Sequence, residues 1–177
     1  MRLALATLLA VAAGVLVGAV VVGGLGIALG YALFADDEPE TGLPAGVLQT
    51  HAALVEAAKS GDYEQLRPLI PETGFTYTFG EPVQDGPIGT WRSLETPRPV
   101  IEILAEILEM PYTLSRGYYV WPFAYDVASV KDLSAHEQEL LESLGPLGTL
   151  FAPGTGYLGW RAGIAPDGTW TFFVASD

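Results

Sequence analysis

Residues Leu3 to Ala35 form an unbroken run of 33 residues that contains no charged side chain. A transmembrane helix requires about 20 consecutive apolar residues, whereas the apolar region of a secretory signal is typically only about 7 to 15 residues long. The length of the run therefore favours a transmembrane anchor, or an uncleaved signal, over residues 1–35. The rest of the chain is long enough for one soluble domain with a single core.

Charged residues at both ends of this run predict its orientation. Arg2 precedes the run, and four acidic residues follow it closely: Asp36, Asp37, Glu38 and Glu40. Positively charged flanks stay on the cytoplasmic side, so we expect a single-pass protein of the cell membrane whose C-terminal domain lies outside the cytoplasm. A long cleaved signal is the alternative, because Gly30-Tyr31-Ala32 places small residues at the −3 and −1 positions of a cleavage site. Both interpretations export the domain.

Small residues recur within the run at a spacing that allows close contact between helices. Gly14 and Gly18 form one small-xxx-small pattern, and Gly26 and Gly30 form another. Such patterns let two membrane helices approach closely, which makes a homodimer one hypothesis. The other is ordinary packing in a span rich in Gly and Ala, and we favour it.

The chain beyond this run is strongly acidic. Residues 36–177 contain seven Lys and Arg and all 21 Asp and Glu of the protein, a net charge of −14. A field of this sign repels phosphate backbones and anionic lipids, so we expect no nucleic-acid partner. The absence of cysteine excludes disulfides and Cys-based zinc sites. No His, Asp and Glu spacing resembles a metal site, and no cofactor is predicted.

Helical periodicity and capping signals predict how the soluble part begins. Residues 36–43 read as a short acidic linker, and residues 44–177 as one extracytoplasmic α+β domain. Ser134 and Glu137 form a capping box, in which each side chain accepts a hydrogen bond from a free backbone N–H of the other residue. We expect helices at four places: 44–61, 62–70, 96–110 and 134–145.

Alternation of apolar and polar residues predicts the strands. Expected strands cover 74–80, 90–94, 112–126 and two at the end of the chain. In the first, Phe75, Tyr77 and Phe79 would share one face. In the last two, one face would carry Leu158, Trp160, Ala162 and Ile164, and one face of the next strand would carry Trp170, Phe172 and Val174. Pro166-Asp167 suits a type I turn between these two strands, with Gly168 in the left-handed region.

A GxGxxG pattern occurs at Gly154, Gly156 and Gly159. A dinucleotide-binding loop requires a strand before it and a helix that opens immediately after it, because the helix N-terminus holds the pyrophosphate. Neither condition is predicted to be met, because "GPLGTLFAP" precedes the glycines and the aromatic, alternating "YLGWRAGIA" follows them. We interpret the glycines as a loop that leads into a hairpin.

Aromatic residues occupy every second position from Tyr119 to Tyr125. If the strand is continuous, Tyr119, Trp121, Phe123 and Tyr125 line one face. Such a stripe is either one wall of a cavity for a small apolar ligand or a sheet face packed on helices. We place these four residues in a predicted ligand-binding set, together with Tyr77 and Trp160 from two other predicted strands.

Few polar side chains stand out as candidates for chemistry. His51 lies on the apolar side of the first helix, where it would be either a general base or a hydrogen-bonded core residue. Asp126 ends the aromatic strand and would act as an acid or base at a pocket mouth, or simply begin a turn. Arg116 and Arg161 flank aromatic strands and would pair with internal acids or hold an anionic ligand; the number of carboxylates favours pairing.

The order of elements resembles the nuclear transport factor 2-like superfamily. The resemblance is carried by "GDYEQLRPLI", "GFTYTFG", "RPVIEILAEIL", "GYYVWPF", "YLGWRAGIA" and "TWTFFVA", and it covers about Leu43 to Asp177. It implies a curved antiparallel sheet wrapped by helices into a cone with an internal cavity. The family includes dehydratases, isomerases, ligand-binding domains and many non-catalytic adaptors. No catalytic motif of its enzymes can be matched residue by residue.

Three functions are compatible with these observations. The first is a membrane-anchored domain that binds a small apolar ligand or a protein partner without catalysis. The second is an isomerase- or dehydratase-like enzyme that uses His51, Asp126 or a cavity Tyr for proton transfer. The third is a structural or assembly protein of the cell envelope that forms a dimer.

Overall fold

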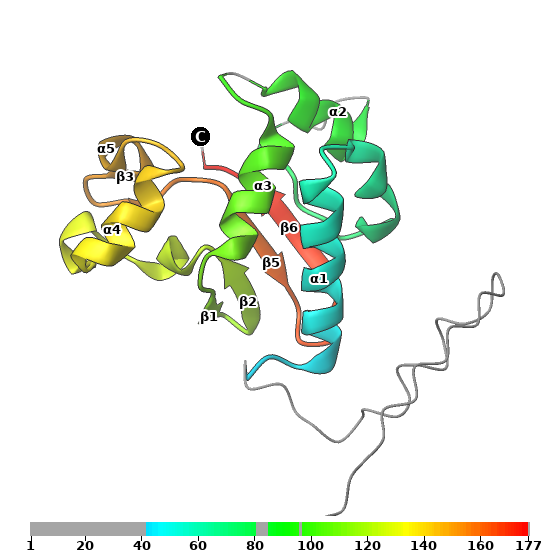
Figure 1. Ribbon diagram of the computed structural model, residues 1–177, viewed down its shortest axis with the longest axis horizontal. Coiled ribbons are helices and arrows are strands. Elements are labelled where there is room, and N and C mark those ends of the chain that lie inside the picture. The colour runs from blue at the N-terminus through cyan, green and yellow to red at the C-terminus, as the bar shows by residue number, and fades with distance from the viewer. Residues whose placement is uncertain (1–41, 81–84, 96, 177) are drawn as a thin grey trace, which may run out of the picture. The chain divides into compact units, whose positions relative to one another are not determined.

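The computed structural model describes residues 42–80, 85–95 and 97–176, which belong to one compact unit. Figure 1 shows an α+β fold in which helices pack on a four-stranded antiparallel sheet with the order β1-β2-β5-β6. The predicted α+β class is therefore confirmed. The predicted anchor over residues 1–35 lies outside the described residues. Within the described ranges, no helix is long and apolar enough to cross a membrane.

The elements follow one another in a simple order. The helices are α1 (Ala45–Lys59), α2 (Gly86–Ser93), α3 (Val100–Glu109), α4 (Ala135–Glu142) and α5 (Leu147–Leu150). The strands of the main sheet are β1 (Thr113–Ser115), β2 (Tyr118–Trp121), β5 (Arg161–Ile164) and β6 (Trp170–Val174). A second, two-stranded sheet pairs β3 (Phe151–Ala152) with β4 (Gly156–Tyr157). Short 3-10 helices are η2 (Tyr63–Gln65), η3 (Arg67–Leu69), η4 (Phe123–Asp126) and η5 (Val130–Asp132).

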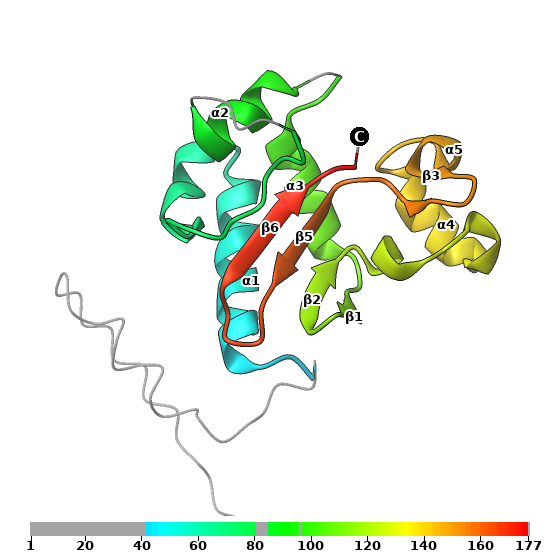
Figure 2. The ribbon, with the colours of Figure 1, turned by 180° about the vertical axis from the view of Figure 1, so that it is seen from behind.

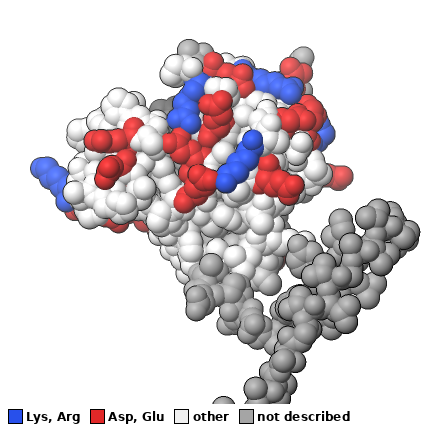
Figure 3. Space-filling model, viewed as in Figure 1, with Lys and Arg blue, Asp and Glu red and all other residues white. Residues whose placement is uncertain are grey.

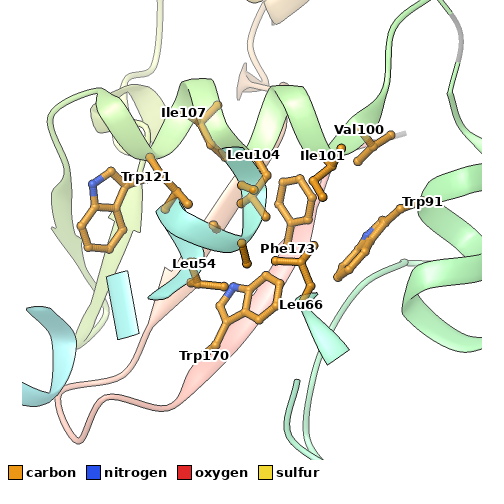
Figure 4. Packing of buried hydrophobic residues seen from close by; sticks show 14 of the residues in the cluster. Leu54, Leu66, Trp91, Val100, Ile101, Leu104, Ile107, Trp121, Trp170 and Phe173 are labelled. Carbon is orange, nitrogen blue, oxygen red and sulfur yellow. The ribbon is translucent and has the colours of Figure 1, made fainter. Parts of the chain in front are cut away.

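Helices α1 and α3 pack against each other and cover one face of the main sheet. Both carry apolar residues at helical spacing, and Leu54 of α1 and Leu104 of α3 are completely buried. Figure 4 shows these side chains converging with Trp170 and Phe173 of β6. This is the main hydrophobic core, and it confirms the predicted helices over 44–61 and 96–110, with α3 beginning a few residues later than expected.

The predicted turn between the last two strands is confirmed. Gly168 has a φ of +91° and its N–H donates to the carbonyl of Ala165. The tip of this hairpin lies against the first two turns of α1, and Thr50 Oγ1 in the second turn donates to the Gly168 carbonyl at 2.5 Å. A Cβ on Gly168 would lie only 2.7 Å from the carbonyl oxygen of Gly46, so the contact depends on a residue without a side chain.

One extra residue in β6 changes which side chains face the core. The register slips between β5 and β6, so that Ile164 pairs with Trp170 while Gly163 pairs with Phe172. Thr171 is the unpaired residue of this β-bulge. The prediction that Trp170, Phe172 and Val174 share a face is therefore wrong: Trp170 and Phe173 enter the main core, and Phe172 lies on the other side.

Two predicted strands have a different structure. Residues 90–94 lie in or directly after α2, where Ile88 and Trp91 are buried three residues apart on one side of the helix. Residues 74–80 form only a single parallel bridge to β6, made by Thr76, whose N–H donates to the carbonyl of Thr171. Phe75 and Tyr77 of that segment pack against the main core, whereas the predicted partner on their face, Phe79, is 61% exposed.

The long aromatic strand predicted over 112–126 is divided into three pieces. β1 and β2 form a hairpin around Arg116-Gly117, and β2 ends at Trp121 because Pro122 has no N–H to continue the ladder. The chain then turns into η4. Alternation stops at that point, so the prediction that Phe123 and Tyr125 continue the face of Tyr119 and Trp121 is wrong.

A smaller hydrophobic cluster forms beside the main sheet. Its buried members are Met110, Ala124, Leu133, Leu141, Leu150, Phe151 and Tyr157. Helix α4 begins with the predicted capping box, in which Glu137 N donates to Ser134 Oγ and Ser134 N donates to Glu137 Oε2. Gly154 and Gly156 both have positive φ around the β3–β4 connection, and no helix follows Gly159. The expectation that no helix opens after the glycines is confirmed. The expectation that no strand precedes them is wrong, because β3 does, and Gly154 and Gly156 lie in a separate β3–β4 hairpin and not in a loop that leads directly into the last hairpin.

Candidate binding face

The two faces of the main sheet are covered differently. Helices α1 and α3 lie on one face, whereas in Figure 2 no helix crosses in front of β5 and β6. Strand pairing assigns Val120, Gly163 and Phe172 to this second face, because they are cross-strand partners. We call it the open face, formed by Tyr118, Val120, Tyr125, Arg161, Gly163 and Phe172.

Phe172 lies at the centre of the open face. It packs into the space left by the missing side chain of Gly163, where a Cβ would overlap the Phe172 ring. Two tyrosine rings lie beside it, with ring centroids 6.2 Å away for Tyr118 and 6.4 Å away for Tyr125. Tyr118 is 39% exposed, so the aromatic surface of this face reaches solvent.

Arg161 begins β5 and lies on the same face. It is only 8% exposed, and it is the one buried charged residue among those the structure describes. Its guanidinium donates to Ser176 Oγ at 2.6 Å and lies 5.5 Å from the ring centroid of Phe79 and 5.6 Å from that of Tyr125. These contacts hold the side chain in place by one hydrogen bond and two cation–π interactions.

No carboxylate of the described residues lies within salt-bridge distance of Arg161. By contrast, Arg67 and Arg92 both bind Glu64, and Arg98 binds Glu106 at 2.6 Å. Burial lowers the pKa of Arg161, and the neighbouring Tyr125 and Tyr157 offset part of this effect. Burial also raises the pKa of Tyr157, so this phenol stays neutral. The expectation that Arg161 pairs with an internal acid is therefore wrong within the described part of the chain.

Arg116 differs from Arg161 in its exposure. It lies in the β1–β2 turn with a φ of +51° and is exposed. Among the described residues no carboxylate pairs with it either, but an exposed guanidinium remains hydrated and needs no partner. Arg116 is thus a surface cation, and Arg161 is the unusual one.

His51 and Asp126 lie on opposite sides of the sheet. His51 stacks on Trp121 with ring centroids 4.8 Å apart, and its Nε2 lies 2.9 Å from the carbonyl oxygen of Leu108, under the covering helices. Asp126 accepts a hydrogen bond from Ser115 Oγ at 2.9 Å on the open-face side. The two groups do not converge on a common atom, so they do not form a joint acid–base pair.

The six residues of the predicted ligand-binding set are dispersed. Tyr119 and Trp121 lie on the helix-covered face with Tyr112, and Tyr77 and Trp160 pack against the main core. Phe123 packs against the smaller cluster. Of the six, only Tyr125 is on the open face. The aromatic side chains thus pack on one another and on the two cores, and they do not line one shared cavity.

A shallow depression of about 380 Å³ lies elsewhere, between η3 and α2. Its lining consists of Arg67, Asp85, Ile88, Gly89 and Arg92. The two arginines are already bound to Glu64 and are more than half exposed. This depression has the chemistry of a solvated surface and shares none of the predicted site residues.

Three neighbours of Arg161 could not be predicted from the sequence. They are the ring of Phe79, the hydroxyl of Ser176 and the phenol of Tyr157. One signal was present, because Arg161 interrupts an otherwise apolar stretch between Trp160 and Ala162. No group of three or more His, Cys, Asp and Glu within the described ranges is arranged to hold a metal ion. No protein-family model, curated protein or solved structure matches the chain, so the open face is interpreted from its own geometry.

Proposed function

We propose that this protein is a membrane-anchored domain, held outside the cytoplasm, that binds a protein partner on its open face without catalysing a reaction. The anchor and the orientation rest on the uncharged run Leu3–Ala35 and its flanking charges. The observation that carries the binding role is the partly exposed aromatic cluster of Tyr118, Tyr125 and Phe172 on the face that α1 and α3 leave uncovered.

Several features favour a protein over a small apolar ligand. Small-molecule sites are concave and enclose most of the ligand, but the aromatic residues expected to line a cavity pack against one another instead. Aromatic residues and arginine are enriched in the centres of protein interfaces, and both occur on the open face. Phe79 and Tyr118 retain much of their exposure until a partner covers them.

The charge of the domain limits the nature of the partner. Residues 36–177 carry a net charge of −14, and Figure 3 shows acidic side chains spread over the side of the helices. A strongly acidic partner would be repelled at long range. We therefore expect a partner whose contact surface is mainly apolar. The resemblance to the nuclear transport factor 2-like superfamily, which includes many non-catalytic adaptors, is in keeping with this role.

A position-specific cross-linking experiment tests the proposal. A photoreactive phenylalanine analogue replaces Tyr118 on the open face, and in a matched control it replaces Glu102, an exposed residue of α3 on the opposite side. The full-length protein is expressed and irradiated in intact cells. We expect a cross-linked product of defined mass from position 118 and none from position 102.

Other results would contradict the proposal in distinct ways. Equal cross-linking from both positions, or none from position 118, would remove the support for an interface on the open face. A product with twice the mass of this chain would identify a homodimer and favour the assembly role. Extraction of the protein from membranes by alkaline carbonate would contradict the anchor.

A further inference from the structure

Arg161 combines burial with an incomplete set of partners, which is an energetically costly arrangement. Arginine remains charged in proteins, and a buried charge is strongly disfavoured unless it is paired or hydrogen-bonded. Within the described ranges its only hydrogen bond is the one to Ser176 Oγ. The two aromatic contacts, with Phe79 and Tyr125, offset part of the cost but do not supply an acceptor.

The unused N–H groups of Arg161 are not completely enclosed, although the residue as a whole is only 8% exposed. Among the described side chains, the only fully buried polar atoms without a partner are the indole nitrogens of Trp91 and Trp170. The guanidinium of Arg161 has five N–H donors, and its nitrogens are not in that set although, of the described residues, only Ser176 accepts from them, so the donors that Ser176 does not engage keep some exposure. A planar group held by its neighbours, with accessible donors, is the arrangement that binds a carboxylate in a bidentate manner.

On this basis we infer that Arg161 receives a single carboxylate of the bound protein, and that Phe79 and Tyr125 contact the apolar groups next to that carboxylate. The inference rests on the proposed role of the open face in partner binding. One carboxylate within an apolar segment fits the site, because a polyanionic segment would be opposed by the negative field of the domain. Both an acidic side chain and a C-terminal carboxylate have the required chemistry.

The direct test is to titrate small carboxylate probes into the full-length protein in detergent micelles and to monitor the NMR signal of Arg161 Nε–Hε. The probes are N-acetyl-phenylalanine, which carries a terminal carboxylate, and N-acetyl-aspartyl-phenylalaninamide, which carries a side-chain carboxylate. N-acetyl-phenylalaninamide is the neutral control. We expect saturable shifts with at least one carboxylate probe and binding at least about tenfold weaker with the amide, because hydrogen bonds to charged groups are the strong ones.

Variants separate recognition by Arg161 from a general effect of charge. Arg161→Met keeps the length of the side chain and removes the guanidinium, and it should abolish the saturable binding. Arg116→Met removes an exposed cation from the β1–β2 turn and should leave the affinity for the carboxylate probes unchanged. The amide signals of β5 and β6 report whether each variant retains the sheet. Equal binding of the amide probe, or full affinity in Arg161→Met, would overturn the inference.

Two further arms remove ambiguity. Binding that appears only in Asp177→Asn would show that the side chain of Asp177 supplies the carboxylate, and would overturn the inference. In the cross-linking experiment, the yield from position 118 should fall at least about fivefold in Arg161→Met, since one lost charge-assisted bond corresponds to at least that factor. An unchanged yield would leave the proposed function standing and refute the role of Arg161. No cross-linking in the parent protein would refute the proposed function, while the titration still decides on Arg161.

Discussion

The main core and the smaller cluster of this domain are built from different kinds of contact. In the main core, helices α1 and α3 pack on β5 and β6, which come more than fifty residues later in the chain, and the core includes the large rings of Trp91, Trp170 and Phe173. The smaller cluster joins short elements that follow one another between residues 110 and 157. We therefore expect the first to control global folding and the second to unfold locally.

The largest expected effect is from Leu104→Ala in α3. Leu104 is completely buried in the main core, so the substitution removes apolar contacts and leaves a cavity beneath both helices. We expect a loss of about 3–5 kcal/mol in the free energy of unfolding. Chemical denaturation of the full-length protein in detergent, followed by tryptophan fluorescence, measures this loss. Leu114→Ala is the matched control, because Leu114 is 61% exposed, and an equal effect of both variants would contradict the proposed core.

A smaller and local effect is expected from Leu141→Ala in α4. Leu141 is also completely buried, but it belongs to the smaller cluster. We expect a cost of about 2–4 kcal/mol that appears mainly as local opening. Hydrogen exchange read by mass spectrometry should show faster exchange over residues 123–157, with protection of α1, β5 and β6 retained. Uniform loss of protection throughout the domain would show that the two clusters unfold as one.

Gly168→Ala addresses the contact between the last hairpin and α1. The substitution introduces a side chain at a φ of +91° and brings its Cβ against the carbonyl oxygen of Gly46. We expect a loss of about 1–3 kcal/mol in stability from backbone strain and this clash. Gly154→Ala is the control, since Gly154 has a similar φ of +81° but nothing within 4 Å of the added Cβ. Thermal unfolding should rank Gly168→Ala as the more harmful of the two.

The smallest expected effect is from Ser134→Ala, which removes the capping box of α4. We expect a loss of about 1 kcal/mol, confined to the smaller cluster. The bonds to Ser134 hold the pKa of Glu137 below its usual value, so the carboxylate contributes stability above the ordinary Glu pKa of 4.5 and this contribution is lost as the pH falls below it. Protection factors in α4, which are exchange rates corrected for the intrinsic pH dependence of amide exchange, should fall in the parent protein as the pH is lowered and change less in Ser134→Ala. Ser129→Ala, which affects a long bond of 3.4 Å, is the control.

Local signals in the sequence predicted a large part of this structure. The capping box at Ser134, the turn at Pro166-Asp167-Gly168 and the apolar faces of α1 and α3 depend on neighbouring residues, so they are visible without tertiary information. They are also the features that the structure confirms most directly.

Features that depend on distant partners could not be predicted in the same way. The bulge at Thr171 reverses the face of Phe172, and it exists only because β5 and β6 pair with a slipped register. The isolated bridge of Thr76 likewise replaces the expected strand 74–80. At the candidate site, the 21 carboxylates of the chain favoured an acidic partner for Arg161 over an anionic ligand, and only the positions of the described carboxylates show that none lies within salt-bridge distance.

The two ends of the β5–β6 hairpin have different surroundings. Its tip, at Gly168, lies against the first two turns of α1, the helix at which the chain enters the described fold. Arg161 pairs with Val174 at the other end of the hairpin, about 10 Å further along β5 than Ile164 at the usual rise per residue. The proposed carboxylate site at Arg161 therefore lies at the opposite end of the β5–β6 hairpin from the tip that contacts α1.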